Sequence, residues 1–159
     1  MSANEFEINH SGLLNFIISQ FGLDIDSVHG IKHWRKVWEI GNYLSGQTKA
    51  DTKIINLFAY SHDAKRENEY DDLEHGKKAR IFIKELYHKK LFCISKSQLD
   101  KLSFACEHHN DPSAKSTDVT IQTCWDADRL DLWRVGIVPD RHSLNTDFAK
   151  QEEVIRLWQ

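Results

Sequence analysis

The residues of this sequence best suited to bind a metal ion are histidines and an aspartate that fall on apolar helical stripes. Residues three, four, seven or eleven positions apart share one face of a helix. By this spacing, His33 shares its face with Val37, Ile40 and Leu44. The same relation to apolar neighbours holds, each in its own segment, for His62, His75, His109 and Asp128. We therefore expect five helices to turn a metal-binding side chain toward the interior.

A buried aspartate sharpens this expectation, because a carboxylate removed from water must be paired or bound to a cation. Imidazole and carboxylate groups together are good ligands for a divalent ion, which also offsets the buried negative charge. An extended buried polar network without metal is the alternative. The pattern favours a metal site.

Helical geometry also separates candidates that are close together in the sequence. Asp126 and Asp128 lie about 200° apart around a helix, so only one of them is expected to face the core. Asp128 lies on the apolar face, which leaves Asp126 as a residue that orients the ligands or as a surface residue. Of His108 and His109, the latter lies on the better stripe. His29 precedes His33 by four residues and can reach the same site.

The elements that position these residues are all predicted to be helices. A first helix is expected from Glu5 to Phe21, ended by a glycine, and a second from Asp26–Ser27 to Ser45–Gly46. Asp51 is expected to cap a third helix that carries residues 54–62. Two capping-box patterns, Asp71 with Glu74 and Ser95 with Gln98, predict the starts of a fourth and a fifth.

Residues that end or start helices also predict the elements in the last third of the chain. Pro112 closes the fifth helix, Ser116–Thr117–Asp118 opens a sixth, and residues 147–158 form a short final helix. No segment alternates with a period of two, so strands are not expected beyond one short stretch near Phe92. The fold class predicted is all-α: a single compact bundle of about six to seven helices over residues 1–159.

Composition limits the classes of function. The chain has 159 residues, 40% of them hydrophobic and 28% charged, with a net charge of -3. This balance predicts one globular domain and argues against a partner that is a nucleic-acid polymer or a membrane. The polar start of the chain lacks a signal-peptide pattern, and three isolated cysteines are typical of a reduced, cytoplasmic protein.

Four of these residues, in order, resemble the signature of a known superfamily. His33, the pair His62–Asp63 and the distant Asp128 are similar to the H…HD…D pattern of the HD-domain superfamily. The resemblance covers about residues 26–139 and includes Asp126-Ala-Asp-Arg-Leu-Asp131, similar to the last motif of the family. There the aspartate just before the basic residue binds metal, which again indicates Asp128. The segment His109-Asn-Asp-Pro112 lacks the glycine that usually ends this turn in the most similar subgroup.

The resemblance implies an HD-type helical core and metal-assisted hydrolysis of phosphate esters, often of nucleotides. One divalent ion held by His33, His62, Asp63 and Asp128 leaves two octahedral positions for an activated water and a phosphate oxygen. Mixed nitrogen and oxygen ligands suit Mn²⁺, Fe²⁺, Ni²⁺, Co²⁺ or Zn²⁺. In some members, histidines between the HD pair and the last aspartate hold a second ion. His75 and His109, or His108, are the candidates here, and without metal one of them can protonate the leaving oxygen.

Charged residues near the signature are candidates for contact with the substrate. Lys65, Arg66 and Arg129 can neutralise charge on the phosphoryl group, since phosphoryl transfer depends on positioning and charge stabilisation. Arg129 can instead pair with Asp126. Glu67, one turn beyond Asp63, can orient the water or act as a general base.

Three functions follow as hypotheses. The leading one is a phosphomonoesterase or phosphodiesterase that acts on a small phosphorylated metabolite. The second is a di-iron oxygenase on the HD fold, because four inward histidines provide a sufficient ligand set. The third is a non-catalytic module that binds a nucleotide or a metal. The sequence alone fixes neither the substrate, nor the number of ions, nor the oligomeric state.

Overall fold

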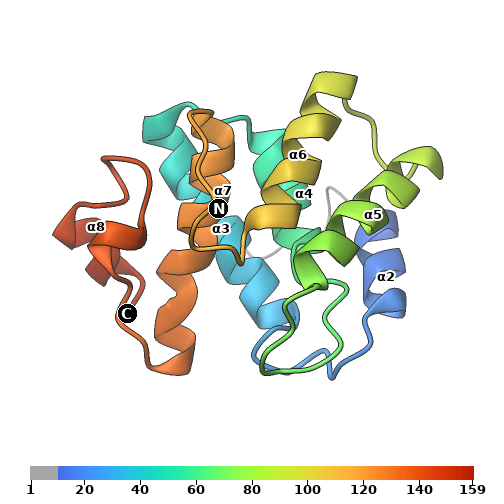
Figure 1. Ribbon diagram of the computed structural model, residues 1–159, viewed down its shortest axis with the longest axis horizontal. Coiled ribbons are helices and arrows are strands. Elements are labelled where there is room, and N and C mark those ends of the chain that lie inside the picture. The colour runs from blue at the N-terminus through green and yellow to red at the C-terminus, as the bar shows by residue number, and fades with distance from the viewer. Residues whose placement is uncertain (1–10) are drawn as a thin grey trace.

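The computed structural model describes residues 11–159 and shows helices and loops, with no β-strand in that range (Figure 1). The α-helices are α2 (Ser11–Gln20), α3 (Ile31–Thr48), α4 (Thr52–Ser61), α5 (His75–His88), α6 (Lys96–His108), α7 (Val119–Leu130) and α8 (Glu152–Leu157). Two 3₁₀ helices, η1 (Asp131–Val135) and η2 (Arg141–Ser143), follow α7. The predicted all-α class is therefore confirmed, and these seven α-helices agree with the number expected. The part of the predicted first helix before Ser11 lies outside the described residues.

The helices pack around one apolar interior. Helix α3 packs mainly against α4 and α7, and α5 packs mainly against α6. Figure 1 shows α2 and α5 at one end of the molecule and α8 at the other. Trp34, Phe58 and Trp125 are fully buried, and the Trp125 indole donates a hydrogen bond to the Ala105 carbonyl at 3.0 Å. This interior fixes α3, α4 and α7 relative to one another.

Three helix starts agree with their predicted caps. The Asp51 side chain accepts a hydrogen bond from the Lys53 amide at the start of α4. Ser95 and Gln98 form both bonds of a capping box at the start of α6. Asp118 accepts from two backbone amides at the start of α7. Each cap provides an acceptor for amides that have no partner inside the helix.

The start of α3 was predicted too early. The chain from residue 22 to 30 forms turns, and the Ile31 amide donates to the Ile25 carbonyl at 2.9 Å before the helix begins. A Cβ atom at Gly30 would lie 2.0 Å from the same carbonyl oxygen, so only glycine fits here. The residues before Ile31 therefore form a turn and not the capped first part of the helix that carries His33.

The start of α5 and the chain end also differ from the predictions. Asp71 and Glu74 do not form a capping box, because Glu74 is itself the N-cap and its side chain makes no capping hydrogen bond. The neighbouring Asp72 carboxylate instead accepts from the Glu67 amide at 2.6 Å. The last helix covers only residues 152–157, and residues 145 and 146 before it are bound to Asp126 of α7. The stretch near Phe92, where one short strand was allowed, is a loop.

Within residues 11–159, no helix combines the length and apolar character that a membrane-spanning segment needs.

Candidate metal centre

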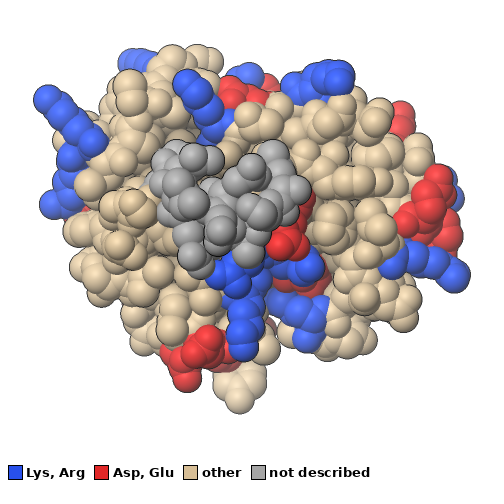
Figure 2. Space-filling model, turned by 180° about the vertical axis from the view of Figure 1, so that it is seen from behind, with Lys and Arg blue, Asp and Glu red and all other residues tan. Residues whose placement is uncertain are grey.

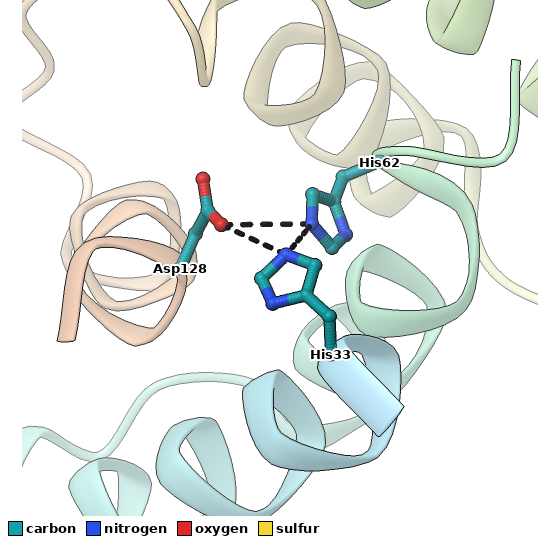
Figure 3. Close-up of side chains that lie close together, drawn as sticks. All are labelled: His33, His62 and Asp128. Atoms are coloured by element: carbon teal, nitrogen blue, oxygen red, sulfur yellow. Dashed lines mark hydrogen bonds and ion pairs between the residues drawn. The ribbon is translucent and has the colours of Figure 1, made fainter. Parts of the chain in front are cut away.

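Three side chains from three helices converge on one point and form what we call the first triad (Figure 3). His33 lies on α3, His62 directly follows α4, and Asp128 lies on α7. The Nε2 atoms of the two histidines are 3.0 Å apart, and Asp128 Oδ1 lies 3.2 Å from His33 Nε2 and 3.6 Å from His62 Nε2. Both imidazoles are buried, whereas the Asp128 side chain is 19% exposed. Solvent therefore reaches the first triad on the Asp128 side.

A second triad lies beside the first. The Nε2 atoms of His75 and His109 are 2.8 Å apart, and Asp63 Oδ1 lies 3.2 Å and 3.4 Å from them, respectively. All three residues are buried. Like the first triad, this group brings three atoms suited to metal binding within 4.8 Å of one another.

Asp63 stands between the two triads. Its Oδ2 atom lies 3.5 Å from His33 Nε2 and 3.7 Å from His62 Nε2, whereas its Oδ1 atom faces the second triad. The sequence interpretation had assigned Asp63 to one four-ligand site together with the first triad. In the structure Asp63 Oδ2 does face the first triad, and Asp63 Oδ1 faces His75 and His109 as well.

The four imidazoles share one arrangement of their ring nitrogens. Each Nδ1 atom bonds an oxygen acceptor: His33 bonds Asp131 Oδ2 at 2.6 Å, His62 the Phe58 carbonyl at 3.0 Å, His109 the Cys106 carbonyl at 2.7 Å, and His75 the Asp72 carbonyl. Such a bond places the hydrogen on Nδ1 and leaves an electron pair on Nε2 of the neutral ring. In both triads, two electron pairs then face each other at hydrogen-bond distance. They repel unless a positive charge lies between them, and a divalent transition-metal ion fits this donor set.

The carboxylates of Asp63 and Asp128 also favour a positive charge at the triads. Burial disfavours a charged carboxylate, but the facing imidazoles hold the pKa of Asp63 and of Asp128 well below the usual range. Burial also disfavours a charged His33, yet the carboxylates of Asp128 and Asp131 beside it raise the pKa of this imidazole. The first triad thus attracts a proton or a metal cation to the same place.

The second triad depends on a close approach of two helices. His75 is the first residue of α5, and His109 caps the end of α6. A Cβ atom on the neighbouring Gly76 would lie 2.3 Å from the Glu107 carbonyl oxygen. The absence of a side chain at position 76 therefore lets the two helix ends meet with their imidazoles in contact.

Asp131 is a site residue that the sequence interpretation did not single out. Its buried carboxylate accepts the hydrogen bond from His33 Nδ1 and lies 3.6 Å from Arg134 Nη1. A signal was available, because Asp131 follows Asp128 by three residues and so belongs to the same helical face. Carboxylates in this position fix the orientation of a metal-binding imidazole and raise its basicity.

We expect the Asp131→Asn substitution to weaken metal binding by about 10- to 100-fold, because the amide cannot draw the Nδ1 hydrogen as the carboxylate does. Titration calorimetry with Mn²⁺ measures this change. Asp100→Asn, an equal charge change on the exposed face of α6, should bind Mn²⁺ as the wild type does. Unchanged affinity in Asp131→Asn would contradict this role.

Asp126 has a different place from the one predicted. Its side chain is fully buried and accepts four hydrogen bonds, from the backbone and side chain of both Asn145 and Thr146, at 2.7–2.9 Å. Burial raises the pKa of this carboxyl despite these bonds. Both Asp126 and Asp128 face the interior, because the C-terminal segment covers a second side of α7. Asp126 thus anchors that segment and does not orient the metal-binding residues.

The other predicted site residues divide into two groups. Arg66 lies at the second triad, with Nη1 3.3 Å from His75 Nε2. His29 pairs with Glu69, and its ring centroid lies 6.4 Å from that of His33. Both therefore border the triads, His29 from the loop before α3 and Arg66 from the loop after α4.

The remaining candidates point elsewhere. Lys65 lies over the Phe82 ring, Glu67 pairs with Lys78 at 2.7 Å, and Arg129 donates to the Ser143 carbonyl at 2.6 Å instead of pairing with Asp126. The His108 ring packs against the Phe104 ring at an interplanar angle of 48°, and His108 Nε2 lies 3.5 Å from Glu107, so His109 is the member of that pair that joins the second triad.

Comparison with known proteins supports the fold. The structure superposes on the crystal structure of a predicted HD superfamily hydrolase from an uncultured Thermotogales bacterium, with a TM-score of 0.71 and 24% sequence identity. The match covers 98% of this chain and 90% of that one. No protein-family model matches the sequence, and no curated protein matches it significantly. The chain has the HD-domain fold, as the resemblance implied.

Proposed function

We propose that this protein is a metal-dependent phosphohydrolase that acts on a small phosphoester, with divalent ions held by the two triads. One observation carries the proposal: two pairs of imidazoles face each other through their Nε2 atoms at 3.0 Å and 2.8 Å, each ring bonds an oxygen at Nδ1, and carboxylates lie beside them. The HD-domain fold agrees with it, and the structural relative is described as a predicted hydrolase.

The expected ions follow from the donors. Four imidazole nitrogens and two carboxylates suit Mn²⁺, Fe²⁺, Ni²⁺, Co²⁺ or Zn²⁺, whereas Mg²⁺ and Ca²⁺ prefer sites made of oxygen ligands. Once bound, such an ion supplies charge stabilisation for phosphoryl oxygens and lowers the pKa of a water molecule.

The chain itself supplies positioning and cationic charge. Arg66 is largely buried, with 8% of its surface exposed, and holds its guanidinium group beside the second triad. It also lines a cavity of about 340 Å³ together with Lys65 and Glu67. A phosphoryl group in this cavity would meet the guanidinium group of Arg66, which also borders the second triad, and phosphoryl transfer requires such charge stabilisation.

The surface agrees with a small-molecule substrate. On the face shown in Figure 2, Lys and Arg side chains stand beside Asp and Glu side chains and form no unbroken basic stripe. A protein that binds a nucleic-acid polymer usually presents such a stripe. A small phosphorylated compound is therefore the proposed partner.

The test is metal analysis followed by a hydrolysis screen. Protein prepared with Mn²⁺, Ni²⁺, Co²⁺ or Zn²⁺ should bind the ion and cleave a phosphomonoester or a phosphodiester. His62→Ala should lose at least about 100-fold in rate, because it removes a first-triad ligand. His108→Ala, which alters a histidine outside both triads, is the control and should remain active. Full activity in His62→Ala would overturn the proposal.

One observation also favours a second candidate, a di-iron oxygenase. Asp63 directs one oxygen toward each triad, which is a suitable arrangement for two neighbouring irons. Two irons after anaerobic purification, with turnover that depends on O₂, would support this function over hydrolysis. Metal binding without turnover in either assay would indicate a non-catalytic binding module.

A further inference from the structure

The guanidinium group of Arg66 is fixed against the second triad by the loop that follows it. Its Nε atom donates to the Asn68 carbonyl at 3.3 Å, and its Nη2 atom donates to the Tyr70 carbonyl at 2.8 Å. The third contact runs from Nη1 to His75 Nε2 at 3.3 Å, and Nη1 also lies 3.8 Å from Asp63 Oδ1. The group thus points at two of the three atoms that would bind a second ion.

One electron pair cannot serve two partners. The Nδ1 atom of His75 is already bonded to the Asp72 carbonyl, so its Nε2 atom has a single electron pair to offer. The Arg66 N–H uses this pair in the structure, and a cation would need the same pair. The guanidinium group also carries a positive charge, so it repels a cation that enters beside it.

The first triad has different surroundings. His33 Nε2 and His62 Nε2 lie near carboxylate oxygens of Asp63 and Asp128, at 3.2–3.7 Å. These negative groups draw a cation in. The two triads, similar in their donors, therefore differ in the charge beside them.

We propose that Arg66 is a built-in competitor for the second metal site, so that the protein binds one ion tightly at the first triad and a second one weakly at His75, His109 and Asp63. The second ion binds only when the guanidinium gives up its bond to His75. Occupancy of the second site then depends on the metal concentration, and the bond between Arg66 and His75 raises the concentration at which the second ion binds. This inference rests on the proposed metal site, but it concerns affinity and does not depend on which reaction follows.

The experiment is titration of metal-free protein with Mn²⁺ by calorimetry, with electron paramagnetic resonance to detect a coupled ion pair. The wild type should bind one ion tightly and a second one much more weakly. Arg66→Met should bind the second ion about 10- to 100-fold more tightly, the effect of removing one charged hydrogen bond, while the first affinity changes little. His75→Ala should lose the second ion.

Two further variants keep the test decisive. Arg66→Gln retains an N–H donor near the position of Nε, which bonds the Asn68 carbonyl, so it serves if Arg66→Met disturbs the loop. Lys65→Met removes the same charge from the neighbouring residue, whose ammonium group lies over Phe82, and should bind both ions as the wild type does. The inference fails if folded Arg66 variants bind the second ion no more tightly, or if Lys65→Met gives an equal gain. Wild-type protein that binds no metal at all would instead overturn the proposed function itself.

Discussion

Replacing Asp63 with alanine is expected to abolish binding of both proposed metal ions, although only one side chain is lost. Its two oxygens face different triads, at 3.5 Å from His33 Nε2 and at 3.2 Å from His75 Nε2. Loss of the ions removes several kcal/mol of charge stabilisation, so the rate of hydrolysis should fall at least about 1000-fold. Elemental analysis and steady-state kinetics measure the two effects.

His109→Ala provides the contrast. It removes a ligand from the second triad alone, so the ion at the first triad should remain bound. Asp100→Asn controls for the loss of one negative charge. If Asp63→Ala keeps both ions, or if it behaves as His109→Ala does, the carboxylate does not serve both triads.

Replacing Asp126 with alanine is expected to lower the stability of the fold and not the affinity for metal. The substitution leaves four donors of Asn145 and Thr146 without their buried acceptor. The free energy of unfolding should fall by about 3 kcal/mol, and the Tm by about 10 °C. Thermal unfolding of the metal-free protein, followed by circular dichroism, measures this change.

Asp128→Ala is the matched variant, two residues away on the same helix. Its carboxylate faces the imidazoles of the first triad, so this variant should lose metal binding while the metal-free protein unfolds near the wild-type temperature. The opposite outcome, a destabilised Asp128→Ala and a metal-deficient Asp126→Ala, would show that the two roles have been exchanged.

Local sequence signals predicted those parts of the fold that local bonds determine. Ser95 with Gln98, Asp51 and Asp118 cap their helices through bonds to residues at most three positions away. The start of α3 was missed because it depends on a turn that packs Gly30 against a backbone carbonyl. The Asp71–Glu74 pattern matched a capping box, but the loop from residue 66 to 72 uses its carboxylates differently.

The site was predictable to a similar extent. Helical periodicity and the H…HD…D pattern identified the histidines and aspartates of the two triads, but not Asp131, which bonds His33. They did not show that Asp63 faces two groups, because it lies past the end of α4, where helical spacing no longer applies. Asp126 was misplaced because a segment almost twenty residues later covers a second face of α7, whereas the periodicity predicted that only the face with Asp128 would face the core.

The contact at Gly76 has a consequence for how this centre can change over evolution. The distance between His75 and His109 is set by a position that carries no side chain and binds nothing. A methyl group at position 76 would push the two helix ends apart and separate the imidazoles of His75 and His109. Every ligand residue would still be present in the sequence. Counting ligands in related sequences is therefore insufficient, and the residue that follows the first of these histidines indicates whether the pair can still close on an ion.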